Sequence, residues 1–259
     1  MRSWKSLQQV TLFEFRLIMR NKIAFLFNLV IPVVMVAILG AHPALVPALA
    51  DLPGVEQSSM LDFLMPGELI YMLLASGLMS VAIGLSTRRQ TGSLRHLFTT
   101  PLPLGAWLTA QSLATIMMAG LQIVVLFVFG WLFFGIHAPY NLPGTVVALI
   151  ISALACLSMG LVAGVMVKSA EATIPLTIII FFVLALFGNA VMPLDGAPAF
   201  MLTIQRLVPS YYMTHALRQV MMQGSGLATV AGDLAILAAW TVTVGGLAVW
   251  RIRRQVTAA

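Results

Sequence analysis

The sequence predicts an all-α membrane protein that crosses the bilayer with six helices, and two observations lead to this fold class. Of the 259 residues, 60% are hydrophobic and only 8% are charged, whereas soluble domains carry about 25% charged residues. The mean hydropathy is +1.00. The apolar residues also gather in runs that suit helices of about 20 residues, the length that crosses the hydrocarbon core. We therefore expect residues 1–259 to form one transmembrane domain.

Six apolar runs define the predicted spans, which are 23–41, 67–86, 108–135, 145–167, 173–193 and 229–250. The third run is longer than a bilayer requires, so this helix is expected to tilt. An even number of spans places both termini on one side, together with 12 of the 14 Lys and Arg residues. Because Lys and Arg are retained in the cytoplasm, both termini are predicted to be cytoplasmic. The outer segments hold Arg206 and Arg218 and the acidic residues Asp51, Glu56, Asp62, Glu68, Asp195 and Asp233.

The segment before the first span predicts a helix over residues 3–22 that lies in the membrane interface. Its basic residues form a narrow stripe on a helical wheel, and apolar residues cover the remaining surface, as in interfacial amphipathic helices. Glu14 falls among the apolar residues and does not fit. The residues expected to hold this helix in the interface are Trp4, Lys5, Arg16 and Arg20. The alternative is a basic lead that only sets the topology.

A cleaved signal peptide is an alternative interpretation of the first span, because Ala48-Leu49-Ala50 resembles a cleavage site. The apolar core of this span exceeds the roughly 7–15 residues of a signal peptide. A retained helix is therefore favoured.

The outer segments are rich in proline. The loop after the first span ends with Pro66-Gly67, a helix-breaking pair that is expected to mark the entrance to the second span. The segment 194–224 is moderately apolar and is interrupted by Pro198 and Pro209. It predicts two short helices, 198–207 and 210–223, that re-enter the edge of the bilayer and pack against neighbouring helices.

The cytoplasmic stretch TGSLRHLFTTPLP, residues 91–103, predicts a short helix with an apolar ridge. Thr91 or Ser93 can cap its N-terminus, and Leu94, Leu97 and Phe98 then share one face. Such a ridge either lies on lipid headgroups or inserts into a groove on another protein.

Motifs for chemistry are absent from the sequence. There is no G-x-x-x-x-G-K-[ST] loop, no H-E-x-x-H and no G-x-S-x-G, and the four histidines are scattered. We therefore expect no catalytic residue, no metal and no cofactor on this chain, and a single cysteine excludes an internal disulfide. The net charge of +6 is attributed to topology rather than to nucleic acid. The polar residues inside the spans are mainly interpreted as helix packing, and those that could line a substrate path are Asn28, Ser76, Ser80, Thr177 and Asn189.

Three stretches resemble the permease subunits of type-2 ATP-binding-cassette (ABC) exporters. LDFLMPG at 61–67 enters the second span, and RRQTGSLRHLFTTPLPLGAWL at 88–108 is similar to the cytoplasmic loop of that family. MPLDGAPAFMLTIQRLVPSYYMTHALR at 192–218 is similar to its proline-rich outer segment. The order of the three stretches relative to the six spans also agrees with the family.

The resemblance implies a role for each segment. The coupling helix, which contacts a separate ATPase subunit, would comprise Thr91, Gly92, Ser93, Leu94, Arg95, His96, Leu97 and Phe98. Arg95 departs from the family, which usually has an acidic residue there. The N-terminal helix would be the interfacial connecting helix. The outer gate would comprise Pro193, Pro209, Tyr211, Tyr212 and Arg218.

The function that the resemblance implies is export driven by ATP. The permease would pair with itself or with a close homologue and with two ATP-binding subunits, which would bind ATP and Mg. Its substrate would be a hydrophobic or amphipathic drug, lipid or lipid-linked glycan, exported across the cytoplasmic membrane of a bacterium. The alternatives are a channel or membrane assembly factor that uses no ATP and, less favoured, an intramembrane enzyme.

Overall fold

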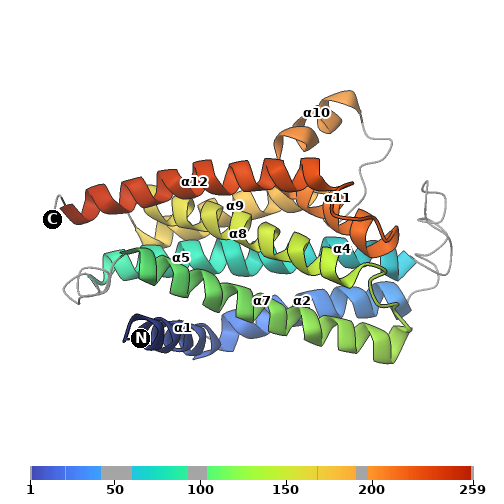
Figure 1. Ribbon diagram of the computed structural model, residues 1–259, viewed down its shortest axis with the longest axis horizontal. Helices are drawn as coiled ribbons and strands as arrows, with labels where there is room; N and C mark the ends of the chain where they lie inside the picture. The colour runs from blue at the N-terminus through green and yellow to red at the C-terminus, as the bar shows by residue number, and fades with distance from the viewer. Residues whose placement is uncertain are drawn as a thin grey trace.

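The computed structural model describes residues 2–20, 22–41, 60–92, 104–167, 169–190 and 198–257, and all regular elements within these ranges are helical. The protein is a bundle of long helices that run roughly side by side (Figure 1). In chain order the elements are α1 (Arg2–Arg20), α2 (Lys22–Ala41), α4 (Met60–Leu73), the π-helix η1 (Leu74–Ser80), α5 (Val81–Gln90), α7 (Leu104–Phe134), α8 (Leu142–Met166), α9 (Ala170–Phe187), α10 (Ala199–Leu207), α11 (Pro209–Met222) and α12 (Ala231–Thr257). The predicted all-α class is confirmed for the part of the chain that the structure describes.

Five helical stretches are long and apolar enough to cross a membrane, which makes this a multi-pass membrane protein. They are Leu61–Gln90, Gly105–Phe134, Leu142–Met166, Ala170–Phe187 and Ala231–Arg254, and they overlap the last five predicted spans. The first predicted span corresponds to α2, whose apolar part, Asn28–Ile38, is shorter. Of the 18 most apolar consecutive residues in Leu61–Gln90, 72% are buried inside the bundle. In Ala231–Arg254 the corresponding share is only 11%. The α4–η1–α5 helix is therefore the centre of the bundle, and α12 lies at its edge.

The central span begins earlier than the sequence predicted. Pro66 and Gly67 were expected at its entrance, but both lie inside α4, which starts at Met60. A proline within a helix removes one backbone hydrogen bond, and this loss does not end a helix that is buried on both sides. Gly67 is required for another reason, because a Cβ at this position would collide with the backbone carbonyl of Ala190.

Small residues hold α8 close to the central helix. Gly77 of η1 packs against Cys156 of α8, and Gly160 lies against the backbone carbonyls of residues 77 and 78. One turn later, Gly164 lies against Ala82. The Gly160–Gly164 pair is a GxxxG pattern, which permits close approach of two helix backbones. Here it joins two helices of the same chain, as expected for packing within one bundle.

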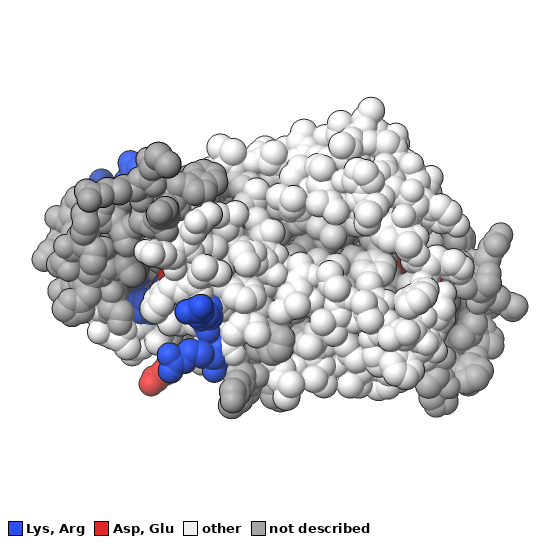
Figure 2. Space-filling model, turned by 60° about the horizontal axis from the view of Figure 1, so that its bottom comes forward, with Lys and Arg blue, Asp and Glu red and all other residues white. Residues whose placement is uncertain are grey.

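The two ends of the bundle differ in their charged residues. The described residues 2 and 257 lie toward the same end, together with the end of α5 (Figure 1). Lys and Arg gather toward this end of the face shown in Figure 2, and most of the remaining surface is uncharged. The arginines at this end, called the basic end below, include Arg16, Arg20, Arg88, Arg89, Arg251, Arg253 and Arg254. The opposite end holds Arg206 and Arg218 and the acidic residues Asp62 and Asp233.

Candidate functional site

The last turn of α5 is the candidate functional site, because it leads directly into the stretch with the predicted coupling helix. Thr91 and Gly92 end α5: the Thr91 amide donates to the Thr87 carbonyl at 2.9 Å, and Gly92 has a φ of +73°. Thr91 therefore belongs to the C-terminal end of α5. Its predicted capping of the next helix concerns residues outside the described ranges and stays a prediction. The remaining coupling-helix residues, 93–98, lie outside the described residues.

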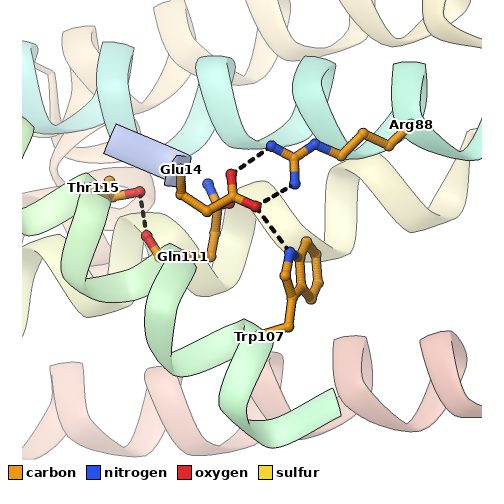
Figure 3. A network of polar contacts seen from close by, with 5 residues as sticks. All are labelled: Glu14, Arg88, Trp107, Gln111 and Thr115. Carbon is orange, nitrogen blue, oxygen red and sulfur yellow. Dashed lines mark hydrogen bonds and ion pairs between the residues drawn. The ribbon is translucent and has the colours of Figure 1, made fainter. Parts of the chain in front are cut away.

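A buried carboxylate joins the end of α5 to the start of α7. Glu14 of α1 is only 1% exposed. Its two oxygens accept hydrogen bonds from both terminal nitrogens of Arg88, with Nη1 2.7 Å from Oε1. The indole Nε1 of Trp107, in the first turn of α7, donates to the same Oε1 at 3.1 Å. Figure 3 shows the three side chains converging from three helices. Burial of an unpaired charge is costly. The hydrogen bonds from Arg88 and Trp107 offset this cost for the Glu14 carboxylate.

The two helices that flank residues 93–103 are thus both fixed to α1. Arg88 lies in the last turn of α5 and Trp107 in the first turn of α7, and Glu14 binds both. The Arg88 guanidinium also lies 5.9 Å from the centre of the Trp107 ring, within range of a cation–π contact. One turn further into α7, Thr115 donates to the Gln111 backbone carbonyl at 2.9 Å (Figure 3).

Arg89 makes a second connection, to α8. Its Nη1 lies 3.0 Å from each of the backbone carbonyls of Gly164, Val165 and Val167. The last carbonyls of a helix lack partners within the helix, so a guanidinium at this position satisfies them and complements the helix dipole. Arg89 therefore holds the C-terminal end of α8 against α5.

The third connection leads to α9. The side-chain oxygen of Gln90 accepts a hydrogen bond from the backbone amide of Ala170 at 3.2 Å, and Ser169 caps α9 through the Ala172 amide. One turn back, the hydroxyl of Thr173 donates to that of Ser86 at 2.9 Å. The last two turns of α5 therefore contact α1, α7, α8 and α9. We call Glu14, Arg88, Arg89, Gln90 and Trp107 the α5 anchor.

This arrangement suits the transmission of force rather than chemistry. The anchor contains one ion pair and several backbone contacts but no nucleophile. Within the described ranges, no group of three or more His, Cys, Asp and Glu residues could hold a metal ion. The anchor was not predicted from the sequence, although one signal was present. A glutamate on the apolar face of an amphipathic helix needs a buried cationic partner, and Arg88 and Arg89 were the candidates.

The predicted interfacial helix is present as α1, which packs mainly against α7. Arg16 and Arg20 are exposed, as a lipid-facing role requires. The side chains of Trp4 and Lys5 lie outside the described residues. Contact of α1 with the membrane interface stays a prediction.

The predicted outer gate lies at the opposite end of the bundle, around α10 and α11, and Pro193 is outside the described residues. The two short helices occupy almost the ranges predicted for them, and Pro209 starts α11. The rings of Tyr211 and Tyr212 meet edge to face at 5.2 Å. The Tyr212 hydroxyl donates to the Arg206 carbonyl at 2.8 Å, which ties the two helices together.

Arg218 links three elements at this end. Its guanidinium lies over the Phe63 ring of α4 at 4.3 Å, and Nη2 donates to the Asn189 carbonyl at 3.1 Å. Asn189 has a φ of +55° in the turn that ends α9. Gating by these residues stays a prediction, but Arg218 clearly fixes α11 against α4 and α9.

The residues predicted to line a substrate path come from α2, η1, α9 and the turn that follows α9. The hydroxyls of Ser76, Ser80 and Thr177 donate to backbone carbonyls of their own helices, at 2.8, 3.3 and 2.8 Å respectively. Such bonds satisfy a hydroxyl in an apolar setting. Asn28 is half-buried on α2, whereas Asn189 belongs to the turn described above. Their contact with a substrate stays a prediction.

Glu68 also lies elsewhere than the sequence predicted. It was assigned to an outer segment, but it lies within α4 and is 6% exposed. Pro66 was expected to mark the start of the span, so Glu68 was placed at its outer edge. Because α4 starts at Met60, Glu68 lies inside the helix instead. The span therefore carries an ionisable group.

Comparison with known proteins agrees with this architecture. A family model described as ABC-2 family transporter protein matches residues 46–250. The transport permease YvfS of Bacillus subtilis is 24% identical over 246 residues, which cover 95% of this chain and 88% of that protein. ABC transporter G family member 20 of Dictyostelium discoideum is 22% identical over 174 residues. This chain spans only 24% of the length of the latter. The helical bundle and the family match together show that this chain belongs to the ABC-2 family of transporters and is a membrane permease component.

Proposed function

We propose that this chain is the membrane-spanning subunit of an ATP-driven exporter, in which a separate ATP-binding subunit binds ATP and Mg. The single observation that carries this proposal is the α5 anchor. Four other helices are fixed to the last turns of α5, directly before the stretch 91–98. A force applied to that stretch therefore reaches most of the bundle through contacts that are already formed.

In this proposal, residues 91–98 form the coupling helix, and its apolar residues Leu94, Leu97 and Phe98 enter a cleft on the ATP-binding subunit. Apolar side chains at i, i+3 and i+4 are the usual anchors of a helix that binds in a groove. The charge distribution supports the location, because Lys and Arg mark the cytoplasmic side of a membrane protein. The basic end, with both termini, is then cytoplasmic, and α2 is the sixth span.

The opposite end of the bundle, with α10 and α11, would form the external gate. Two permease subunits, either identical or closely homologous, and two ATP-binding subunits would make up the transporter in the cytoplasmic membrane. The exposed surfaces of α7 and α9 are apolar, which suits a hydrophobic or amphipathic substrate. Closure of the ATP-binding subunits would move the coupling helices and open the gate.

Co-purification tests this proposal. The tagged permease is purified from its native membrane, and bound proteins are tested for Mg-dependent ATP hydrolysis. We expect an ATP-binding subunit to accompany the wild type but not the variant with both Leu97→Asp and Phe98→Asp. The matched control is Tyr140→Asp, which places a charge on a residue that is 78% exposed at the opposite end. The proposal is wrong if no ATPase accompanies the wild type.

A further inference from the structure

Glu68 is a carboxylate that lies well inside the central span. It is seven residues from Leu61, the first residue of that span, which corresponds to about 10 Å of helix at roughly 1.5 Å per residue. Only 6% of its surface is exposed. Ionisable residues at such depth are costly, and proteins retain them where they act on a substrate, an ion or a partner.

The carboxylate of Glu68 has no partner among the described residues. The other described acidic residues with buried or half-buried side chains are paired: Glu14 with Arg88, Asp62 with His137 and Asp233 with His215. No hydrogen bond or ion pair of this kind reaches Glu68 within the described ranges. A structural carboxylate would be expected to have a donor.

Aromatic side chains connect Glu68 with the surface of α9. Tyr71 follows Glu68 by three residues on α4, so the two side chains lie on the same face of the helix. The Tyr71 ring meets the edge of Phe181 at 4.9 Å, and Phe181 meets Phe182 at 5.7 Å. Tyr71 is half-buried and Phe182 is 65% exposed. The three rings therefore extend from the face of α4 that carries Glu68 to the apolar exterior of α9.

We propose that Glu68, together with Tyr71, Phe181 and Phe182, binds the positively charged group of a lipophilic cation, and that this cation is the transported substrate. A carboxylate supplies the opposite charge, and aromatic ring faces attract cations, most strongly where water is excluded. The apolar body of the ligand would lie against the exposed face of α9, which includes Ile178 and Phe182. This inference rests on the proposed function, because it names the chemical class of the exported substrate.

Two lipophilic ions of the same shape and opposite charge test this site. Tetraphenylphosphonium and tetraphenylborate are offered separately to the purified permease in lipid nanodiscs, and their affinities are measured by equilibrium dialysis. We expect Glu68→Gln to weaken tetraphenylphosphonium binding by about tenfold or more, the effect of roughly one lost charge contact. The affinity for tetraphenylborate should not fall. Tyr71→Leu should weaken cation binding severalfold and Tyr71→Phe much less, because the ring face is retained.

The matched control is Asp62→Asn, which removes a charge from the same helix at a residue paired with His137. This variant should bind the cation as the wild type does. Thermal unfolding of Glu68→Gln shows whether the variant folds, and we expect its midpoint to be equal or higher, because an unpaired buried charge is lost. Unchanged tetraphenylphosphonium affinity in a folded Glu68→Gln protein would overturn the inference. Because no ATPase is present in this assay, its failure is distinguishable from failure of the proposed exporter function.

Discussion

Glu14 and Arg88 form a bidentate ion pair although they are 74 residues apart in the chain, and the Glu14 carboxylate is almost completely buried. The indole of Trp107 shares this carboxylate from a third helix. The two helices that flank residues 93–103 are thereby joined through one side chain of α1. The anchor thus couples the N-terminal helix to the segment that we propose to contact the ATP-binding subunit.

Removal of one partner of this pair should destabilise the protein more than removal of both. Arg88→Met leaves the Glu14 charge buried with only the Trp107 donor, and we expect a loss of about 3 kcal/mol in the free energy of unfolding. Adding Glu14→Leu should recover most of that loss, because no buried charge then remains. Unfolding in detergent, followed by circular dichroism, measures the cycle, and Arg16→Gln on the exposed face of α1 is the control. Equal losses in the single and double variants would contradict the assignment.

Arg89 should influence coupling rather than assembly. Its Nη1 reaches three carbonyls at the end of α8, and the ammonium of a lysine, whose side chain is one bond shorter, does not reach the same position. We expect Arg89→Lys to retain the ATP-binding subunit but to lower substrate-stimulated ATP hydrolysis by about tenfold, equivalent to roughly 1.4 kcal/mol.

The measurement compares basal and stimulated hydrolysis of the purified complex, with Arg253→Lys of α12 as the control. Unaltered stimulation in Arg89→Lys would show that the end of α8 does not take part in coupling.

The contact between α8 and η1 should not tolerate a side chain at Gly160. A methyl group there would collide with the Gly77 carbonyl and lie 2.8 Å from the Leu78 carbonyl. We expect Gly160→Ala to lower stability by about 1–3 kcal/mol, as in other overpacked cores. Gly120 lies in open space on α7, so Gly120→Ala should be neutral or slightly stabilising. Thermal unfolding of both variants tests this, and equal stability of the two would contradict the close helix packing.

Cysteine labelling tests the proposed orientation. The only cysteine, Cys156, is 0% exposed and should not react, so the wild type supplies an unreactive background. A membrane-impermeant maleimide should label Tyr140→Cys in intact cells, because residue 140 lies at the opposite end of the bundle. Thr91→Cys, at the exposed end of α5, should be labelled only after permeabilisation. The reverse pattern would place the basic end outside and remove the basis for coupling to a cytoplasmic ATPase.

Several features of the fold were predictable because they depend on local sequence. The spans follow from apolar runs, and α10 and α11 follow from the prolines that separate them. The starts of helices were less predictable, as Pro66 shows. A proline is compatible with a helix interior when neighbouring helices cover it, and the sequence does not show which helices those are. The misplacement of Glu68 is a direct consequence.

The sequence by itself determined that this chain is a helical membrane protein with its positive charge at one end, because hydropathy and charge act residue by residue along the chain. Only the tertiary structure decided which residues satisfy the buried Glu14, since its partners are 74 and 93 residues away. The same holds for Glu68, whose lack of a partner among the described residues is visible only when the surrounding helices are in place. Pairing between distant residues depends on helix packing, and a one-dimensional pattern does not specify that packing.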